Sequence, residues 1–172
     1  EISACLVGSE MCIRDSTRKY WRPLKTLSEK PRRAFLDSMV FIFGRLEECN
    51  SKLILFLALR GEFEVVVSEL VIEEVERFFR ENFGREASFL ARRFVETLSA
   101  RVVRRFEVES EIEELRGTIK DKDLENLAVV RHEKIGYLVA YNSDYEVAKV
   151  KEYITPKDFV KLFGLKPHYG TY

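Results

Sequence analysis

The sequence predicts a single α/β domain with a mostly parallel central sheet flanked by helices. Short apolar, β-branched segments alternate with segments of helical periodicity, and no internal repeat or low-complexity tract interrupts them. The 172 residues suffice for one hydrophobic core and are few for two. Because helices connect the successive strands, most strands are expected to run in the same direction.

In the first part of the domain, the sequence pattern predicts two strands, each followed by a helix. The run 34–43 is apolar on both faces, which is typical of a buried strand, and the charge of Asp37 is out of place within it. Residues 45–59 have helical spacing. The β-branched run 62–68 predicts a second strand, and Ser68 at its end can cap the helix that follows.

The second part of the domain continues the alternation. The expected elements are a helix at 86–100, a strand at 101–108, a helix at 121–133, strands at 136–141 and 152–155, and a helix at 155–164. The last helix has the clearest limits, since Thr155 can be its N-cap, Pro156 its first residue and Gly164 the residue beyond its end.

Two segments precede this domain and differ from it in composition. Residues 1–16 end in GSEMCIRDS, whose back-translation resembles a transposase adapter of sequencing libraries, so we interpret them as adapter-derived. Residues 17–33 hold seven basic residues against one acid and predict a basic leader or arm, which either contacts phosphates or is simply solvated. The domain itself is expected at 34–166, with a C-terminal tail at 167–172.

Composition excludes several classes of protein. The three cysteines lack CxxC spacing, which argues against a disulfide scaffold or a zinc site and fits a reducing, cytoplasmic location. The longest apolar run, 53–59, is far shorter than the roughly 20 residues that span a bilayer, so no membrane insertion is expected. Abundant Glu, Lys and Arg without any glutamine are typical of a thermophilic source.

Acidic residues are expected where a parallel sheet carries its functional site, beyond the carboxyl ends of the strands. Asp37 lies toward the end of the first predicted strand, and Glu74 lies on the helix after the second. Asp123 begins the helix before the strand 136–141, and Asp144 follows that strand. Converging carboxylates repel one another unless a divalent cation lies among them, and oxygen ligands select Mg²⁺ or Mn²⁺.

Five motifs follow one another along residues 33–167, namely FLDSMV, FEVVVSELVIEEVERF, DKDLENLA, YLVAYNSDYE and YITPKDFVKLFGL. Their order and spacing resemble the PIN-domain ribonucleases, a family that includes the VapC-type toxins of toxin–antitoxin pairs. The resemblance implies a PIN-like domain that hydrolyses RNA phosphodiester bonds with Mg²⁺ or Mn²⁺ as cofactor, cutting single-stranded or looped RNA.

The resemblance also implies catalytic roles for the acidic residues. Asp37 matches the first aspartate of the family, and Glu74 matches the helix glutamate, which would bind the metal through water or orient the nucleophile. Asp123 matches the third acid, with Asp121 as a close competitor. At least one of these last two could be a plain helix cap, and Glu74 could belong to a solvated acidic face.

The remaining matches are less regular. Asn142 stands where many members of the family carry an aspartate, so Asp144 is assigned as the fourth acid and metal ligand, although it could be a turn residue. Ser38 matches the small hydroxyl residue usually found beside the first aspartate. Met39 departs from the Asn or Ser that commonly follows.

Two other functional classes stay open. Met39 and Asn142 favour a PIN-fold module that binds RNA or a protein partner without cutting. A flavodoxin-like receiver domain would carry phosphate on a strand-end aspartate, but it needs a lysine after a late strand, and GYLVAYNSDYE offers none.

The resemblance implies three partners, namely RNA, an antitoxin protein and a second copy of the chain. Leu53, Phe56 and Leu57 could form a dimer face, although core burial explains them equally well. The zero net charge conceals a mildly acidic domain of 25 acidic and 21 basic residues beside the basic arm. RNA binding would therefore depend on the metal, the arm and a local basic face such as Arg101, Arg104 and Arg105.

Overall fold

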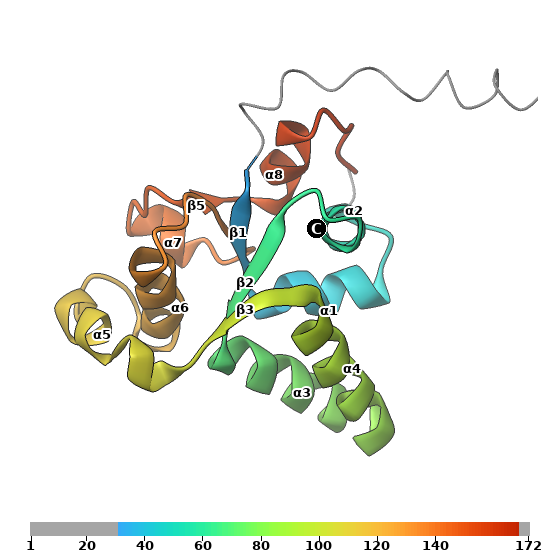
Figure 1. The fold of residues 1–172 in the computed structure, drawn as a ribbon, viewed down its shortest axis with the longest axis horizontal. Helices are drawn as coiled ribbons and strands as arrows, with labels where there is room; N and C mark the ends of the chain where they lie inside the picture. Colours follow the sequence, from blue (N-terminus) through green and yellow to red (C-terminus); the bar gives the residue numbers. More distant parts are fainter. Residues whose placement is uncertain (1–30, 169–172) are drawn as a thin grey trace, which may run out of the picture.

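The computed structural model describes residues 31–168, which form one α/β domain around a five-stranded sheet (Figure 1). The strands are β1 (Arg33–Leu36), β2 (Glu64–Ser68), β3 (Ser99–Val103), β4 (Leu138–Val139) and β5 (Tyr153–Ile154). Their order is β3-β2-β1-β4-β5, and all four pairings are parallel. The predicted fold class is therefore confirmed.

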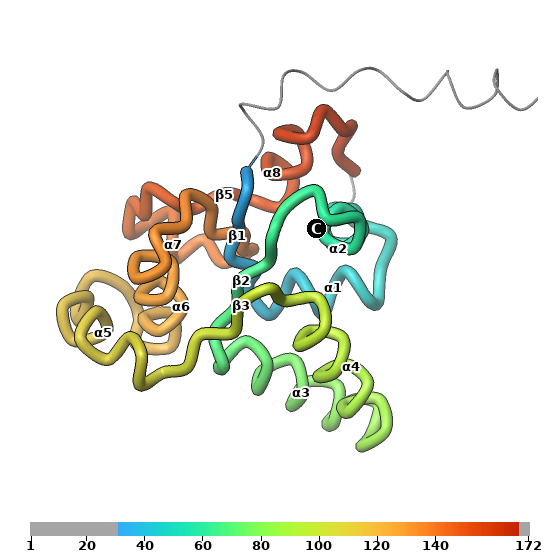
Figure 2. The backbone as a smooth tube through the Cα atoms, viewed as in Figure 1, coloured from blue at the N-terminus to red at the C-terminus, as the bar shows by residue number. Residues whose placement is uncertain are grey.

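Helices cover both faces of this sheet (Figures 1 and 2). They are α1 (Ser38–Leu46), α2 (Asn50–Leu59), α3 (Glu69–Phe83), α4 (Arg85–Leu98), α5 (Glu109–Leu115), α6 (Asp121–His132), α7 (Asp144–Val147) and α8 (Pro156–Leu162). Figure 1 shows α5 and α6 on one side of the sheet and α1, α2 and α4 on the other. No helix in the described residues is long and apolar enough to cross a membrane.

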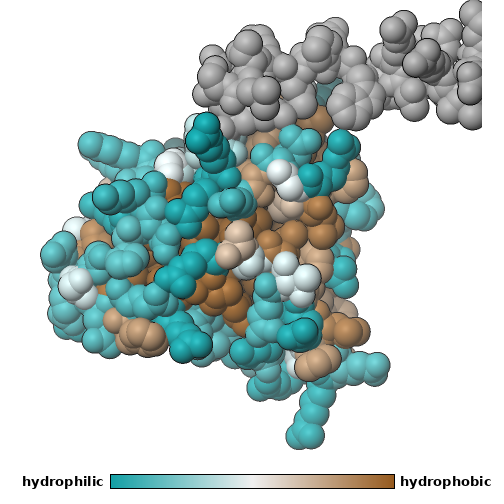
Figure 3. Space-filling view, in the orientation of Figure 1, coloured by the Kyte–Doolittle hydropathy of each residue, from teal (hydrophilic) through white to brown (hydrophobic). Residues whose placement is uncertain are grey.

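The core follows from the apolar runs in the sequence. Ala34, Phe35 and Leu36 of β1 are fully buried, as are consecutive residues of β2. Strands that are covered on both faces need apolar side chains at successive positions, which explains why these runs do not alternate. Charged side chains cover much of the outer face, with apolar residues between them (Figure 3).

The prediction of a strand over 34–43 is wrong in its second half. The strand β1 ends at Leu36, Asp37 is the N-cap of α1, and the apolar residues that follow are helical. A continuous apolar run is compatible with a buried strand or a buried helix, so periodicity alone could not separate the two. The helix predicted over 45–59 is in fact the end of α1 and the whole of α2. These helices pack closely because Gly44 has no side chain, and a Cβ there would lie 2.5 Å from Leu55 Cδ1.

The strand predicted over 101–108 is also shorter than expected. The strand β3 ends at Val103, and the Glu107 side chain then accepts a hydrogen bond of 2.9 Å from the Arg104 backbone N–H. A 3₁₀ turn and the unpredicted helix α5 follow. The short helix α7 follows β4 and begins at Asp144.

The predicted helix caps are confirmed. Ser68 Oγ accepts a hydrogen bond of 3.2 Å from the Val71 N–H, and Thr155 Oγ1 accepts one of 3.2 Å from the Asp158 N–H. Near the C-terminus, the His168 backbone N–H donates to the Asn50 side chain at 2.8 Å and joins the tail to α2. The adapter segment and most of the basic arm lie outside the described residues.

Candidate active site

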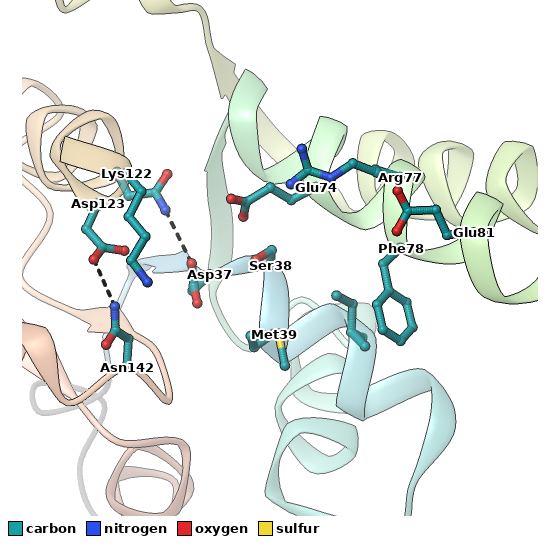
Figure 4. Close-up of a pocket in the computed structure, with 12 residues that line it drawn as sticks. Asp37, Ser38, Met39, Glu74, Arg77, Phe78, Glu81, Lys122, Asp123 and Asn142 are labelled. Carbon is teal, nitrogen blue, oxygen red and sulfur yellow. Dashed lines mark hydrogen bonds between the residues drawn. The ribbon is translucent and has the colours of Figure 1, made fainter. Parts of the chain in front are cut away.

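A pocket of about 340 Å³ lies at the carboxyl edge of the sheet, between β1, whose connection leads to β2 on one side, and β4, whose connection leads to β5 on the other (Figure 4). This is the place at which an open parallel sheet binds its ligands. Four segments line the pocket: the start of α1, the middle of α3, the first turns of α6 and the residue Asn142 after β4. The lining residues are Asp37, Ser38, Met39, Ile42, Glu74, Arg77, Phe78, Glu81, Lys122, Asp123, Asn126 and Asn142.

Asp37 lies deepest among the acids, with 7% of its surface exposed. Burial raises its pKa to about 7, and the charges of Glu74 and Asp123 add to the effect, whereas the backbone N–H groups of Ser38 and Met39 lower it in part. Within residues 31–168, no lysine or arginine forms an ion pair with Asp37. Asp37 is therefore a buried acid that only hydrogen bonds stabilise in the described protein.

Asn126 holds Asp37 in place and was missed at the level of the sequence. Its Nδ2 donates a hydrogen bond of 3.2 Å to Asp37 Oδ1, and its Oδ1 accepts one of 2.7 Å from Ser68 Oγ. Because Ser68 also caps α3, the amide joins the start of that helix to the end of β1. Its place three residues after Asp123, on the same face of α6, was the available signal.

Asp123 is the second buried acid of the pocket, with 8% of its surface exposed. Burial is the main reason why its pKa is raised. Asn142 donates from Nδ2 to Asp123 Oδ2 at 2.9 Å, and its own Oδ1 accepts a bond of 3.0 Å from the Asp144 backbone N–H. Asn142 therefore links Asp123 to the first turn of α7.

Asp144 and Asp121 do not line the pocket. The Asp144 carboxylate accepts a hydrogen bond of 2.8 Å from Lys120 Nζ, which is the main reason why its pKa is lowered. Asp121 lies in the first turn of α6 and is exposed. Of the predicted site residues, the pocket thus brings together Asp37, Ser38, Glu74, Asp123 and Asn142.

The donor atoms of the pocket suit a hard divalent cation in their chemistry. They are carboxylate, hydroxyl and amide oxygens, and the buried charge of Asp37 has no cationic partner in the described chain. Within residues 31–168, no group of three or more Asp, Glu, His or Cys side chains is arranged so that it could hold one ion. The residues fit Mg²⁺ or Mn²⁺ by type, with Asp37 and Asp123 as the buried candidates.

The basic face expected at Arg101, Arg104 and Arg105 is largely neutralised. Arg101 pairs with Glu107 and Glu133, and Arg105 pairs with Glu125 at 3.5 Å. These arginines also lie outside the carboxylate pocket, so they add little positive charge near it.

No protein-family model and no curated protein matches the chain. Solved structures do resemble it. A toxin–antitoxin complex from Klebsiella pneumoniae matches with a TM-score of 0.56 at 16% identity, over 72% of this chain and 97% of that chain. The described residues therefore have a PIN-like fold, as the five sequence motifs predicted.

Two further solved structures share this fold. One is VapC20 from Mycobacterium tuberculosis, described as a toxin that cleaves the sarcin–ricin loop, with a TM-score of 0.51 and 21% identity over 67% of this chain and 94% of that chain. The other is VapBC2 from Rickettsia felis bound to a DNA fragment from its promoter, with a TM-score of 0.56 and 14% identity over 72% of this chain and 96% of that chain.

Proposed function

We propose that the protein is a divalent-metal-dependent endoribonuclease that hydrolyses RNA phosphodiester bonds. The observation that carries the proposal is Asp37, a buried acid without a cationic partner in the described chain, in a pocket that Glu74 and Asp123 also line. Burying a carboxylate without an ion-pair partner is costly. A site that binds a cation and a phosphate explains why such an acid is retained.

Some pocket residues would bind the metal, and others orient the residues that bind it. Asp37 and Asp123 would hold Mg²⁺ or Mn²⁺, and Glu74 would act through a bound water. When bound, such an ion neutralises charge on the phosphate and lowers the pKa of a coordinated water. Asn126 and Asn142 each donate a hydrogen bond to one of the two aspartates and fix its orientation.

Asp144 stays a predicted fourth ligand. In the described geometry its carboxylate is bound to Lys120, and only its backbone N–H reaches the site, through Asn142. Direct binding of the metal would require Asp144 to exchange Lys120 for the ion.

The partner of such an enzyme would be an antitoxin protein in the cytoplasm. This part of the proposal is supported by the likeness in fold to a toxin–antitoxin complex and to VapBC2. A homodimer is the further partner expected from the sequence. Of the residues suggested for its face, Phe56 is exposed, Leu53 is partly buried and Leu57 is buried.

Cleavage of single-stranded RNA in Mn²⁺, with and without EDTA, tests the proposed activity. The matched variants are Asp37→Asn and Glu133→Gln, which both convert a carboxylate to an amide, the second one away from the pocket. Cleavage should need the metal, disappear in Asp37→Asn and persist in Glu133→Gln. Activity that survives EDTA or the Asp37 substitution would exclude this site as its source.

A binding module that does not cut is the alternative. It is favoured by Asn142 beside Asp123 in place of an acid, and by the lack of a three-acid cluster in the described residues. Binding of RNA or of a protein without any cleavage in Mg²⁺ or Mn²⁺ would favour this alternative. In that case Mn²⁺ would also fail to raise the melting temperature.

A further inference from the structure

The carboxylate pocket has two unlike halves. In Figure 4, Asp37, Asp123 and Asn142 lie together at one end, Phe78 lies at the other, and Met39 lies between them. Ile42, one turn further along α1 than Met39, adds to this apolar end. A metal and a phosphate alone would make no use of this apolar surface, whereas a ligand with a flat apolar group would.

The Phe78 ring is held in position from behind. It packs edge to face on Phe79, with ring centroids 5.6 Å apart, and it contacts Phe83 at 6.5 Å. The side chain is partly buried, packs against the core and still lines the pocket. It therefore presents a rigid aromatic surface to a ligand, at little cost in side-chain entropy on binding.

Two cations flank the pocket from opposite helices. Arg77 on α3 extends its guanidinium toward Glu74, and Lys122 on α6 lies at the acidic end (Figure 4). In the described part of the chain neither forms an ion pair, whereas the neighbouring Arg80 and Lys120 both do. Lys122 acts on Asp123 from a distance, since its charge lowers the pKa of that acid in part.

A nucleotide of an unpaired strand matches all three features. Its flat base suits an apolar wall with an aromatic ring, and the phosphates on either side of it suit the two cations. A base within a duplex cannot reach such a wall, because both its faces are stacked. Glu81, exposed at the outer rim, can accept hydrogen bonds from a base amino group.

We propose that Met39, Ile42 and Phe78 form a subsite for one unpaired base of the RNA strand, with Arg77 and Lys122 binding the phosphates that flank it. The identity of the strand as a substrate rests on the proposed ribonuclease function, whereas its binding at this subsite does not. The subsite selects the base that lies next to the reacting phosphate.

Binding of short single-stranded RNA tests this subsite. The full chain with Asp37→Asn is used, so that the RNA stays intact, and fluorescence anisotropy reports the Kd for a series of oligonucleotides in which one abasic site moves along the strand. Stacking of one base on an aromatic side chain corresponds to a factor of about 5 to 150 in Kd. One abasic position should therefore weaken binding by about that factor, and duplex RNA should bind more weakly than the single strand.

Substitutions of the aromatic residues assign the effect to the pocket. Phe78→Leu keeps an apolar side chain but loses stacking, so it should weaken binding of the intact strand and abolish the penalty of the abasic site. Phe78→Tyr should restore both. Phe89→Leu is the matched control, because Phe89 on α4 is exposed and does not line the pocket, so this variant should bind like the protein that carries Asp37→Asn alone.

The subsite is refuted if the penalty of the abasic site in Phe78→Leu equals the penalty in its parent, or if no oligonucleotide binds. Cleavage is measured separately with Asp37 intact. Binding that depends on Phe78 without any cleavage would overturn the proposed function and leave the subsite standing. A cleavage rate that does not change when Phe78 or Arg77 is substituted would overturn the subsite alone.

Discussion

Two carboxylates at opposite ends of β1 differ in whether they have ion-pair partners. Asp37, at the carboxyl end of β1, is buried without a cationic partner in the described chain, and its pKa is raised to about 7. Glu133 follows α6 beside the first residue of β1, with 16% of its side chain exposed. It receives hydrogen bonds from Arg33 at 2.8 Å and from Arg101 at 3.1 Å.

The difference separates an acid that is paired within the fold from an acid that has no ion-pair partner in the described residues. Burial alone would raise the pKa of Glu133, but the hydrogen bonds from its two arginines lower it below its usual range. Glu133 is therefore stable as an anion within the protein. Asp37 is less stable as an anion, and a bound cation would supply the positive charge that the described residues do not place beside it.

The largest expected contrast is in catalysis. Asp37→Asn should lower the rate of RNA cleavage by at least about a hundredfold, because metal-assisted stabilisation of the reacting phosphate is worth several kcal/mol. Glu133→Gln should cleave at nearly the wild-type rate per folded molecule. Rates are measured with the same single-stranded RNA in Mn²⁺, and equal losses in both variants would contradict the division between a functional and a structural acid.

The next contrast is in stability without metal. The two substitutions should change the free energy of unfolding in opposite directions. In EDTA at pH 8, Asp37→Asn should raise the free energy of unfolding by about 2–4 kcal/mol, since it removes a buried charge and keeps the acceptor for Asn126. Glu133→Gln should lower it by about 1 kcal/mol, because Arg33 and Arg101 lose a charged partner. Urea unfolding followed by circular dichroism gives both values.

The difference in stability between Asp37→Asn and the wild type should increase with pH. The folded protein keeps a proton on Asp37 up to about pH 7, whereas the unfolded chain loses it near the ordinary value of 3.8. This contribution to stability is thus complete below about pH 4 and is lost as the pH rises toward 7. The advantage of Asp37→Asn over the wild type should grow across that window and then stay constant. A difference that is the same at about pH 4.5 and pH 8 would mean that Asp37 titrates normally.

Residue patterns predicted the architecture and the principal acid. The alternation of apolar runs and helical segments was enough for a parallel sheet, and Asp37 was recognisable as a charge within an apolar run. The boundary between β1 and α1 was not recognisable, because both elements are buried and share one apolar run. Asn126 was missed because it is an uncharged amide, although its spacing from Asp123 was a usable signal. The contact between Lys120 and Asp144 was out of reach, because it forms only when the chain between them folds back.

The smallest expected effect on cleavage is that of substituting Asp144. This acid lies at the edge of the site but, like Glu133, forms an ion pair. In the described geometry its carboxylate binds Lys120 and does not line the pocket, so Asp144→Asn should lower the cleavage rate by less than about tenfold. Asp123→Asn is the matched comparison, because Asp123 lines the pocket, and its loss should be at least about a hundredfold. Both are measured over a range of Mn²⁺ concentrations. If Asp144→Asn loses as much as Asp123→Asn and needs more Mn²⁺, Asp144 exchanges Lys120 for the metal during function and is a ligand, as the sequence predicted.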